Sequence, residues 1–287
     1  MKEPGYTSCG GTAFYWGRRT YIIGVLNVSP DSFSGDGLAD VEAALTSAKR
    51  LASEGADMID VGGESTRPGS APVSVAEELH RVIPVVDILS QEISLPLSID
   101  TYKLEVARQA LDSGASMIND VWGLKREPAL AQLAAERGAP IVLMSNQRDS
   151  FPCKDIVSAV VADLESAIQQ ASAAGVGQEN IIIDPGIGFG KTQEQNLEIL
   201  RRLEELKALG RPILLGSSRK SVIGWVLDLS SEQRAEQAAF VPCADPRIEG
   251  TAVTIAIGIA KGADIVRVHD VKEMLRVCKM SDAIVRG

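Results

Sequence analysis

Carboxylate and amide side chains stand at the ends of short apolar runs in this chain, and their types suit the binding of a small ring. Asp100, Asn119 and Asp184 each close such a run. A carboxylate at the mouth of an apolar interior is costly unless a hydrogen-bond donor fills the space beside it. A flat heterocycle with an amidine- or guanidine-like edge offers paired N–H groups that fit a carboxylate. An internal salt bridge to Lys220 is the structural alternative.

A second set of residues suits an anion. The segment Gly216-Ser-Ser-Arg-Lys-Ser221 places two cations and three hydroxyls after one apolar run, and Arg267 and His269 close the next run. Arg67 adds a cation from a loop rich in glycine and proline, where a solvated surface charge is the alternative. Because the chain has a formal net charge of −9, cations gathered in this way predict a site for a phosphate-like anion.

Two loops have the composition of active-site lids. The loop at residues 27–37 carries small polar residues, two glycines and Phe33. Asn27 at its start could place a neutral oxygen on Mg²⁺, which prefers oxygen ligands shared with substrate phosphates. The segment at residues 181–192, Ile-Ile-Ile-Asp-Pro-Gly-Ile-Gly-Phe-Gly-Lys-Thr, superficially resembles a phosphate loop, but Pro185 stands where the Walker pattern needs glycine. We predict a mobile loop there with Phe189 at its tip.

The elements that must position these residues alternate regularly. Short apolar, β-branched runs predict strands at Tyr21–Asn27, Asp57–Gly62, Leu97–Asp100, Ser116–Asp120, Pro140–Met144, Ile181–Asp184, Pro212–Gly216 and Asp264–Val268. Amphipathic segments predict helices at Leu38–Ser53, Ser74–Gln91, Lys103–Ser113, Pro128–Arg137, Lys154–Ala174, Gln193–Ala208, Ile248–Lys261 and Val271–Ile284. Eight strand–helix pairs predict an α/β fold, the (β/α)8 TIM barrel, in which the carboxyl ends of the strands form the catalytic face. An open doubly wound sheet is the alternative, because periodicity cannot show closure. We expect one domain over residues 1–287, with residues 1–20 as a short N-terminal extension.

Composition narrows the class of protein. Apolar residues make up 45% and charged residues 23% of the 287 positions, which is ordinary globular usage. The acidic charge argues against a nucleic-acid partner, and no apolar run approaches the roughly 18–20 residues of a membrane span. With no secretory signal recognised, we expect a cytoplasmic protein without a membrane partner. The four cysteines form no Cys-x-x-Cys pair, and the two histidines, of which His80 is assigned to no site, cannot build a multi-histidine metal centre.

Seven motifs occur in a fixed order along nearly the whole chain. They are Gly24-Val-Leu-Asn-Val-Ser-Pro-Asp-Ser-Phe-Ser, Asp60-Val-Gly-Gly-Glu-Ser-Thr-Arg-Pro-Gly, Ser98-Ile-Asp-Thr, Ile118-Asn-Asp, Ile183-Asp-Pro-Gly-Ile-Gly-Phe-Gly-Lys, Ser218-Arg-Lys-Ser221 and Val266-Arg-Val-His-Asp-Val271. Together they resemble the dihydropteroate synthase family. The resemblance implies a transferase of folate synthesis that joins 6-hydroxymethyl-7,8-dihydropterin pyrophosphate to p-aminobenzoate. It releases pyrophosphate, forms 7,8-dihydropteroate and uses Mg²⁺.

The resemblance also implies a role for each site residue. The pterin would be held by Asp100, Asn119, Asp184, Lys220 and Arg267. The pyrophosphate would be held by Asn27 with Mg²⁺, Arg67, Arg267 and His269. The p-aminobenzoate pocket would comprise Phe33, Thr66, Pro68, Phe189, Ser218 and Ser221. In this family the C–O bond breaks early, so Asp100 is expected to stabilise the developing positive charge, with Asp184, Lys220 and Arg267 as the other catalytic residues.

Further expectations and alternatives accompany this interpretation. A homodimer is expected, and sulfonamides are expected to compete with p-aminobenzoate, since no Phe-Gly insertion stands near Phe189. Two segments depart from the family pattern: Ser145-Asn-Gln-Arg148 replaces His-Met-Gln-Gly, which puts a pterin contact in question, and the stretch Ser230–Pro246 is longer than usual. The alternatives are a methyltetrahydrofolate–corrinoid methyltransferase, a Schiff-base aldolase using Lys220, and a pterin-binding protein without turnover.

Overall fold

Eight parallel strands form the centre of the molecule in a computed structural model, which describes residues 5–28, 38–65, 71–149, 153–229 and 245–287. The strands are β3 (Tyr21–Asn27), β4 (Met58–Gly62), β5 (Leu97–Asp100), β6 (Met117–Asp120), β7 (Ile141–Met144), β8 (Ile181–Asp184), β9 (Leu214–Leu215) and β10 (Ile265–Val268). Their order is β8-β7-β6-β5-β4-β3-β10-β9, and a parallel bridge between Ile183 and Ile213 joins the two edges. The predicted barrel is confirmed, and its closure removes the open-sheet alternative.

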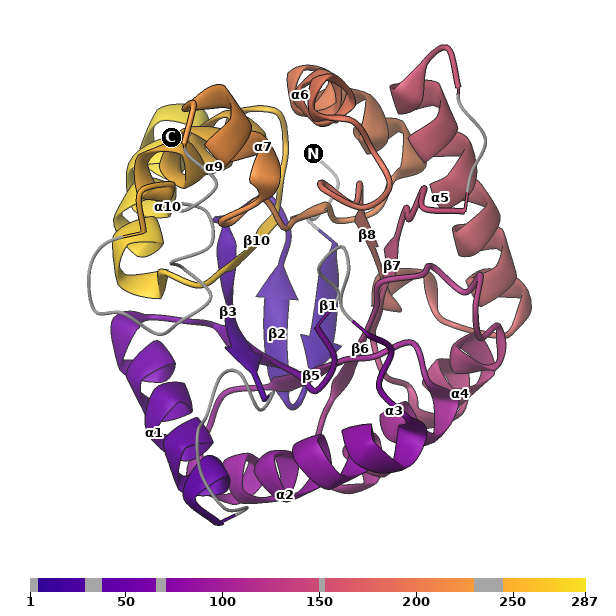
Figure 1. Cartoon of the computed structure of the whole chain (residues 1–287). Helices are drawn as coiled ribbons and strands as arrows, with labels where there is room; N and C mark the ends of the chain where they lie inside the picture. The colour runs from indigo at the N-terminus through magenta and orange to yellow at the C-terminus, as the bar shows by residue number, and fades with distance from the viewer. Residues whose placement is uncertain (1–4, 29–37, 66–70, 150–152, 230–244) are drawn as a thin grey trace.

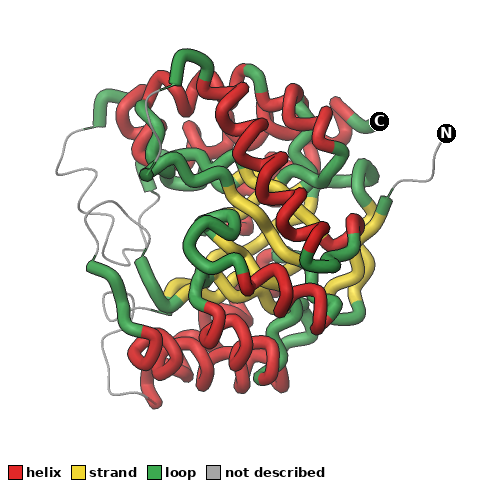
Figure 2. Tube along the Cα trace, turned by 90° about the vertical axis from the view of Figure 1, so that its right-hand side faces the viewer, coloured by secondary structure: helices red, strands yellow, loops and turns green. Residues whose placement is uncertain are grey.

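Helices surround the barrel on all sides (Figures 1 and 2). They are α1 (Leu38–Glu54), α2 (Val75–Glu92), α3 (Leu104–Asp112), α4 (Ala129–Arg137), α5 (Ile156–Ala173), α6 (Gln193–Arg201), α7 (Ser221–Val226), α9 (Ile248–Ala260) and α10 (Val271–Val285), with 3-10 turns at Gln178–Asn180 and Leu203–Leu209. Their apolar faces pack on the outer faces of the strands. Every residue of β7 and of β8 is buried. None of the helices in the described ranges is long and apolar enough to cross a membrane.

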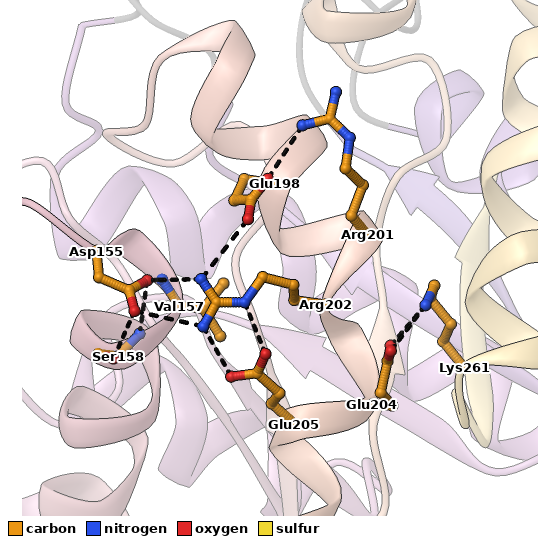
Figure 3. Close-up of polar contacts among 9 residues, drawn as sticks. All are labelled: Asp155, Val157, Ser158, Glu198, Arg201, Arg202, Glu204, Glu205 and Lys261. Atoms are coloured by element: carbon orange, nitrogen blue, oxygen red, sulfur yellow. Dashed lines mark hydrogen bonds and ion pairs between the residues drawn. The ribbon is translucent and has the colours of Figure 1, made fainter.

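The helix predicted at Gln193–Ala208 is two elements, because Arg202 leaves the helical conformation at φ −116° and ψ 21°. Its guanidinium reaches the N-cap of α5, where it donates from Nη1 to Asp155 Oδ1 at 3.0 Å. It also donates from Nε to Glu205 Oε1 at 2.6 Å, so one side chain ties α5, α6 and the following 3-10 turn together (Figure 3). The Arg202 guanidinium holds the pKa of the exposed Asp155 carboxyl at about 2.

A β-hairpin that the sequence analysis did not predict precedes the barrel. Strands β1 (Tyr6–Cys9) and β2 (Thr12–Tyr15) pair antiparallel and lie within the outline of the barrel in Figure 1. Phe14 is buried with its ring centroid 5.0 Å from that of Tyr21 in β3. It shares one apolar cluster with Met58, Met117 and other residues near the amino ends of the strands. The hairpin therefore closes the end of the barrel opposite the polar face.

Strand register brings the predicted site residues to one rim. Asn27 stands opposite Gly62, Gly62 opposite Asp100, and Asp100 opposite Asn119 in successive parallel pairs. These positions are the carboxyl ends of β3 to β6, which is the face where barrel enzymes place their catalytic residues.

Candidate active site

A buried ion-pair cluster crosses the interior of the barrel. Arg267 on β10 donates from Nε to Asp60 Oδ2 at 2.6 Å and from Nη2 to Asp100 Oδ2 at 2.8 Å. Asn119 Nδ2 donates to the same Asp60 oxygen at 3.1 Å. Since Asp60 is only 1% exposed, the guanidinium is fixed between two carboxylates of β4 and β5. The alternative of a salt bridge from the carboxylates to Lys220 is wrong for Asp100, because Arg267 is its ion-pair partner.

Asp60 is a member of this cluster to which the sequence analysis assigned no role. It is a buried carboxylate in the otherwise apolar strand Met58-Ile-Asp-Val-Gly62, and such a group needs a cation. That signal was present in the sequence, whereas the identity of the cation was not, because Arg267 is 207 positions away. Asp60 orients Arg267 and Asn119, both of which were predicted to contact the pterin.

Two oxygens of the cluster have no hydrogen-bond partner among the residues that the structure describes. They are Asp60 Oδ1 and Asp100 Oδ1, both buried. Burial is the main cause that raises the pKa of Asp100 to about 7, Arg267 opposes it, and the carboxylates of Asp60 and Glu78 add to it. A ligand that donates N–H groups to Asp100 would satisfy this oxygen and favour the charged carboxylate. The site is therefore complementary to the donor-rich edge of a heterocycle.

Asp184, at the end of β8, and Lys220, after β9, extend the set of polar groups around the barrel. Asp184 is 7% exposed and accepts a hydrogen bond from Gly186 N at 2.7 Å. Burial raises the pKa of Asp184, and this backbone donor opposes the rise. Burial together with the charge of Arg267 lowers the pKa of Lys220 to about 8. The ammonium of Lys220 lies 4.1 Å from the ring centroid of Phe189 and within electrostatic range of Asp184 and Asp100.

Phe189, predicted at the tip of a mobile loop, is buried in the structure. It is 7% exposed and shares a small apolar cluster with Val121 and Met144. Gly188, at φ +83°, helps to fold the loop back so that the ring faces inward. The guanidinium carbon of Arg148 lies 4.8 Å from the same ring centroid. The ring therefore forms a wall of the site next to Lys220.

The segment after β9 contributes one cation to the site rather than the two predicted. Arg219 donates from Nε to Asp270 Oδ2 at 3.0 Å and lies 3.3 Å from Asp245 Oδ2, so its charge is already paired. Lys220 is the cation of this segment that interacts electrostatically with Asp184 and Asp100. Ser218 Oγ lies 3.1 Å from His269 Nδ1, which brings the loops after β9 and β10 together.

The rest of the predicted site lies at the rim or outside the described residues. Asn27 is exposed at the carboxyl end of β3. Ser221 begins α7 and accepts a hydrogen bond from Gln193 Nε2 at 3.4 Å. His80, which entered no predicted site, is exposed on α2. Four predicted residues lie outside the described ranges: Phe33, Thr66, Arg67 and Pro68.

The unusual segment after β7 has a structural explanation. Ser145 Oγ donates to Asp163 Oδ2 on α5 at 2.7 Å, and Gln147 Nε2 donates to the same oxygen at 3.1 Å. Asn146 Nδ2 donates to Val121 O at 2.9 Å. These hydrogen bonds attach the loop after β7 to α5 and to the segment after β6. Ser145, at the position where the family pattern has histidine, therefore helps to hold this loop in place. Most of the other unusual stretch, residues 230–244, lies outside the described ranges.

These observations define a class of protein: a TIM-barrel enzyme whose polar groups at the carboxyl ends of the strands are complementary to a donor-rich heterocycle. Residues 23–269 match a family model described as pterin binding enzyme. A dihydropteroate synthase of Clostridium beijerinckii is 50% identical and covers 96% of this chain and 98% of its own. One from Bacillus subtilis is 47% identical, over 95% of this chain and 91% of its own.

Solved structures of dihydropteroate synthases are also similar to this chain. A dihydropteroate synthase from Clostridium difficile, crystallised in the presence of pteroic acid, is 49% identical with a TM-score of 0.87 over 95% of this chain and 99% of its own. The synthase of Xanthomonas albilineans with 4-aminobenzoic acid is 39% identical with a TM-score of 0.87 over 98% of both chains. A Yersinia pestis synthase in complex with a sulfonamide drug is 37% identical with a TM-score of 0.85, over 97% of this chain and 98% of its own.

The chain belongs to the dihydropteroate synthase family of pterin-binding enzymes. The predicted family, barrel and transferase activity are thereby confirmed, and the methyltransferase and aldolase alternatives are set aside.

Proposed function

We propose that the polar rim of this barrel carries out each step of the synthase reaction with the residues predicted from the sequence. The observation that carries this proposal is the buried cluster of Asp60, Asp100 and Arg267, beside Asp184 and Lys220. It leaves a carboxylate oxygen of Asp100 without a partner among the described residues. A dihydropterin supplies the N–H donors that this cluster lacks. We also propose that residues 1–287 act as one domain, with the hairpin as its N-terminal extension.

The pterin edge is bound by acceptors and donors on different strands. Asp100 and Asp184 accept from ring N–H groups, Asn119 hydrogen-bonds the edge between them, and Lys220 donates to a ring acceptor. Arg267 borders the ring, held in place by its two ion pairs at 2.6 and 2.8 Å. Because these groups are fixed before the substrate arrives, little reorganisation is needed at the moment of reaction.

Bond cleavage places charge where the site can neutralise it. The C–O bond of the pterin methylene breaks, pyrophosphate leaves with the electron pair, and positive charge develops on the methylene and ring. The Asp100 carboxylate stabilises that charge, while Arg267 and His269, with Arg67, bind the departing anion. The amine of p-aminobenzoate then forms the new C–N bond and loses a proton. Exclusion of water by the closed site protects the cationic intermediate from hydrolysis.

Magnesium fits this rim as an ion shared with the substrate. The part of the chain that the structure describes contains no cluster of three or more acidic, histidine or cysteine residues able to hold a metal. Asn27 offers one amide oxygen at the exposed end of β3, and Mg²⁺ commonly completes its shell with phosphate oxygens and water. When bound there, Mg²⁺ would neutralise charge on the leaving pyrophosphate.

The p-aminobenzoate pocket is proposed on the side of Phe189, Ser218 and Ser221, together with Phe33, Thr66 and Pro68. Phe189 supplies a flat apolar wall and Ser218 a hydroxyl beside His269. The Xanthomonas albilineans structure with 4-aminobenzoic acid and the Yersinia pestis structure with a sulfonamide drug support binding of these two kinds of ligand. We expect sulfonamides to compete with p-aminobenzoate for it. Growth of a complemented synthase-deficient strain in sulfamethoxazole would contradict this expectation.

A homodimer is proposed through the face formed by α7, α9 and α10. This face exposes large apolar side chains at 43–73% of their surface, a set typical of an interaction surface. They are Trp225, Val226, Leu227, Val253, Ile257, Met280, Ile284 and Val285. Sedimentation of the purified chain should give twice the 30.5 kDa of one copy, and Ile257→Glu should return it to one copy.

The reaction is tested by measuring both products from the purified chain. With Mg²⁺, the pterin pyrophosphate and p-aminobenzoate, we expect pyrophosphate and dihydropteroate in equal amounts. Pyrophosphate released without p-aminobenzoate would support early C–O cleavage. Tight pterin binding with neither product would instead identify a pterin-binding protein without turnover and refute the proposed reaction.

A further inference from the structure

We propose that Lys191 is a positioning residue that fixes Phe189 in the site by joining the loops after β7 and β8. This inference rests on the role proposed above for Phe189 beside p-aminobenzoate. Lys191 closes the Gly-Phe-Gly-Lys motif, and the sequence analysis assigned no role to this lysine.

The ammonium of Lys191 is turned into its own loop. Nζ donates to the backbone carbonyls of Ser145 at 2.7 Å, Gly186 at 2.9 Å and Phe189 at 3.3 Å. A lysine ammonium has three N–H donors, and each of them has one carbonyl acceptor here. In a phosphate loop the lysine reaches the ligand, whereas in this chain the charge is used between two loops.

The backbone around the ammonium is too close for side chains. A Cβ on Gly186, which has φ +70°, would lie 2.1 Å from Ser145 O. A Cβ on Gly190, also at φ +70°, would lie 2.2 Å from Arg148 N. Glycine at both positions lets carbonyl groups from two loops converge on one point, where their dipoles would repel one another without a cation.

The same carbonyl groups set the position of Phe189. Phe189 O accepts from Lys191 Nζ and from Gln147 N at 3.2 Å, while Phe189 N donates to Gly186 O at 3.1 Å. Both backbone polar groups of Phe189 are therefore fixed within this arrangement, and its ring lies 4.1 Å from the ammonium of Lys220. Removal of the Lys191 donors leaves the carbonyl oxygens of Ser145, Gly186 and Phe189 with one donor fewer each and releases the ring wall.

The test compares Lys191→Met with Lys125→Met. The first keeps most of the side-chain volume and removes the donors. The second removes a lysine that donates to Asn146 O in the loop after β7 at 2.6 Å and to Asp163 Oδ2 on α5 at 2.8 Å. We expect Lys191→Met to raise the KM for p-aminobenzoate about tenfold or more, equivalent to about 1.4 kcal/mol. We expect Lys125→Met to change it less than about threefold, and pterin affinity to change little in either variant.

A double-mutant cycle with Phe189→Leu separates positioning from general destabilisation. If Lys191 acts through Phe189, Lys191→Met in the Phe189→Leu background should add less than about twofold to the KM for p-aminobenzoate. Two results would overturn the inference on Lys191 and leave the proposed role of Phe189 intact. One is that the two substitutions have additive effects on the KM for p-aminobenzoate; the other is that Phe189→Leu raises this KM while Lys191→Met leaves it unchanged. An unchanged KM in Phe189→Leu would overturn the proposed role of Phe189 as well. Should Lys191→Met not fold, Lys191→Gln, which keeps two N–H donors, takes its place in the same cycle.

Discussion

Replacing Asp60 with asparagine removes one of the two anions that hold Arg267. The Asp60 side chain is 1% exposed and accepts one charge-assisted hydrogen bond from Arg267 at 2.6 Å and one hydrogen bond from Asn119 at 3.1 Å. An amide keeps the shape and one acceptor, and Arg267 keeps its bond to Asp100. The expected loss is therefore that of one hydrogen bond between charged groups, about 1.5–3 kcal/mol, rather than that of an isolated buried charge.

Thermal unfolding and a pH profile measure the two consequences. At about 2–4 °C per kcal/mol, the melting temperature should fall by about 3–12 °C. Burial is the largest cause of the raised pKa of Asp100, and the negative charge of Asp60 raises it further. Neutralising Asp60 should therefore lower the pKa of Asp100. The acid limb of kcat/KM for the pterin substrate should then move to lower pH.

An exposed ion pair provides the control. Asp112 pairs with Arg137 at 2.6 Å with both side chains more than a third exposed, and Asp112→Asn should change stability by less than about 1 kcal/mol. An unchanged melting temperature in Asp60→Asn, or an acid limb that moves to higher pH, would refute the assignment of Asp60 as the residue that orients Arg267 and tunes Asp100.

Three further outcomes are expected. Phe14→Ala should lower the free energy of unfolding by about 3–5 kcal/mol in chemical denaturation, because it empties the apolar plug of the barrel, while an effect below about 1 kcal/mol would show that the hairpin does not close it. Because the folded-state pKa of Asp100 is raised to about 7, its contribution to the stability of the ligand-free protein is present at low pH and lost as the pH rises from about 4 to 7; Asp100→Asn should flatten that part of the stability curve, and an unaltered slope would contradict the assignment. Asn27→Ala should raise the Mg²⁺ concentration needed for half-maximal activity about tenfold with less change in pterin affinity, whereas an unchanged magnesium titration would exclude Asn27 as the ligand.

The barrel strands were predictable because each is a mainly apolar run that ends in, or is followed directly by, a polar or turn-forming residue. The hairpin was not predicted, although Gly10-Gly11 between Tyr6–Cys9 and Thr12–Tyr15 is a two-residue turn signal. Its strands are four residues long and mix polar with aromatic side chains, so their periodicity is weak. The division of the predicted 193–208 helix depends on Arg202 reaching Asp155 on another helix, which no local pattern shows.

Within the site, residue types were predictable and pairings were not. Asp100, Asn119, Asp184, Lys220 and Arg267 stand out in sequence because charged or amide groups at strand ends need partners. The choice of Arg267 as the partner of Asp60 and Asp100, and of Asp270 as the partner of Arg219, depends on strand order and side-chain direction across the closed barrel. The burial of Phe189 follows from the close approach of two loops, joined by a contact between residues 46 positions apart, which again is a three-dimensional property.

The most direct test of the proposed mechanism is the single-turnover rate of pyrophosphate release in Asp100→Asn, measured with the pterin site saturated. The Asp100 carboxylate is proposed to stabilise positive charge that appears only as the C–O bond breaks. The account therefore predicts a fall of about 100-fold or more in this rate. The dissociation constant of the pterin should change by less than about tenfold. A release rate within a few-fold of the original enzyme at full pterin occupancy would contradict the role of Asp100 in the reaction.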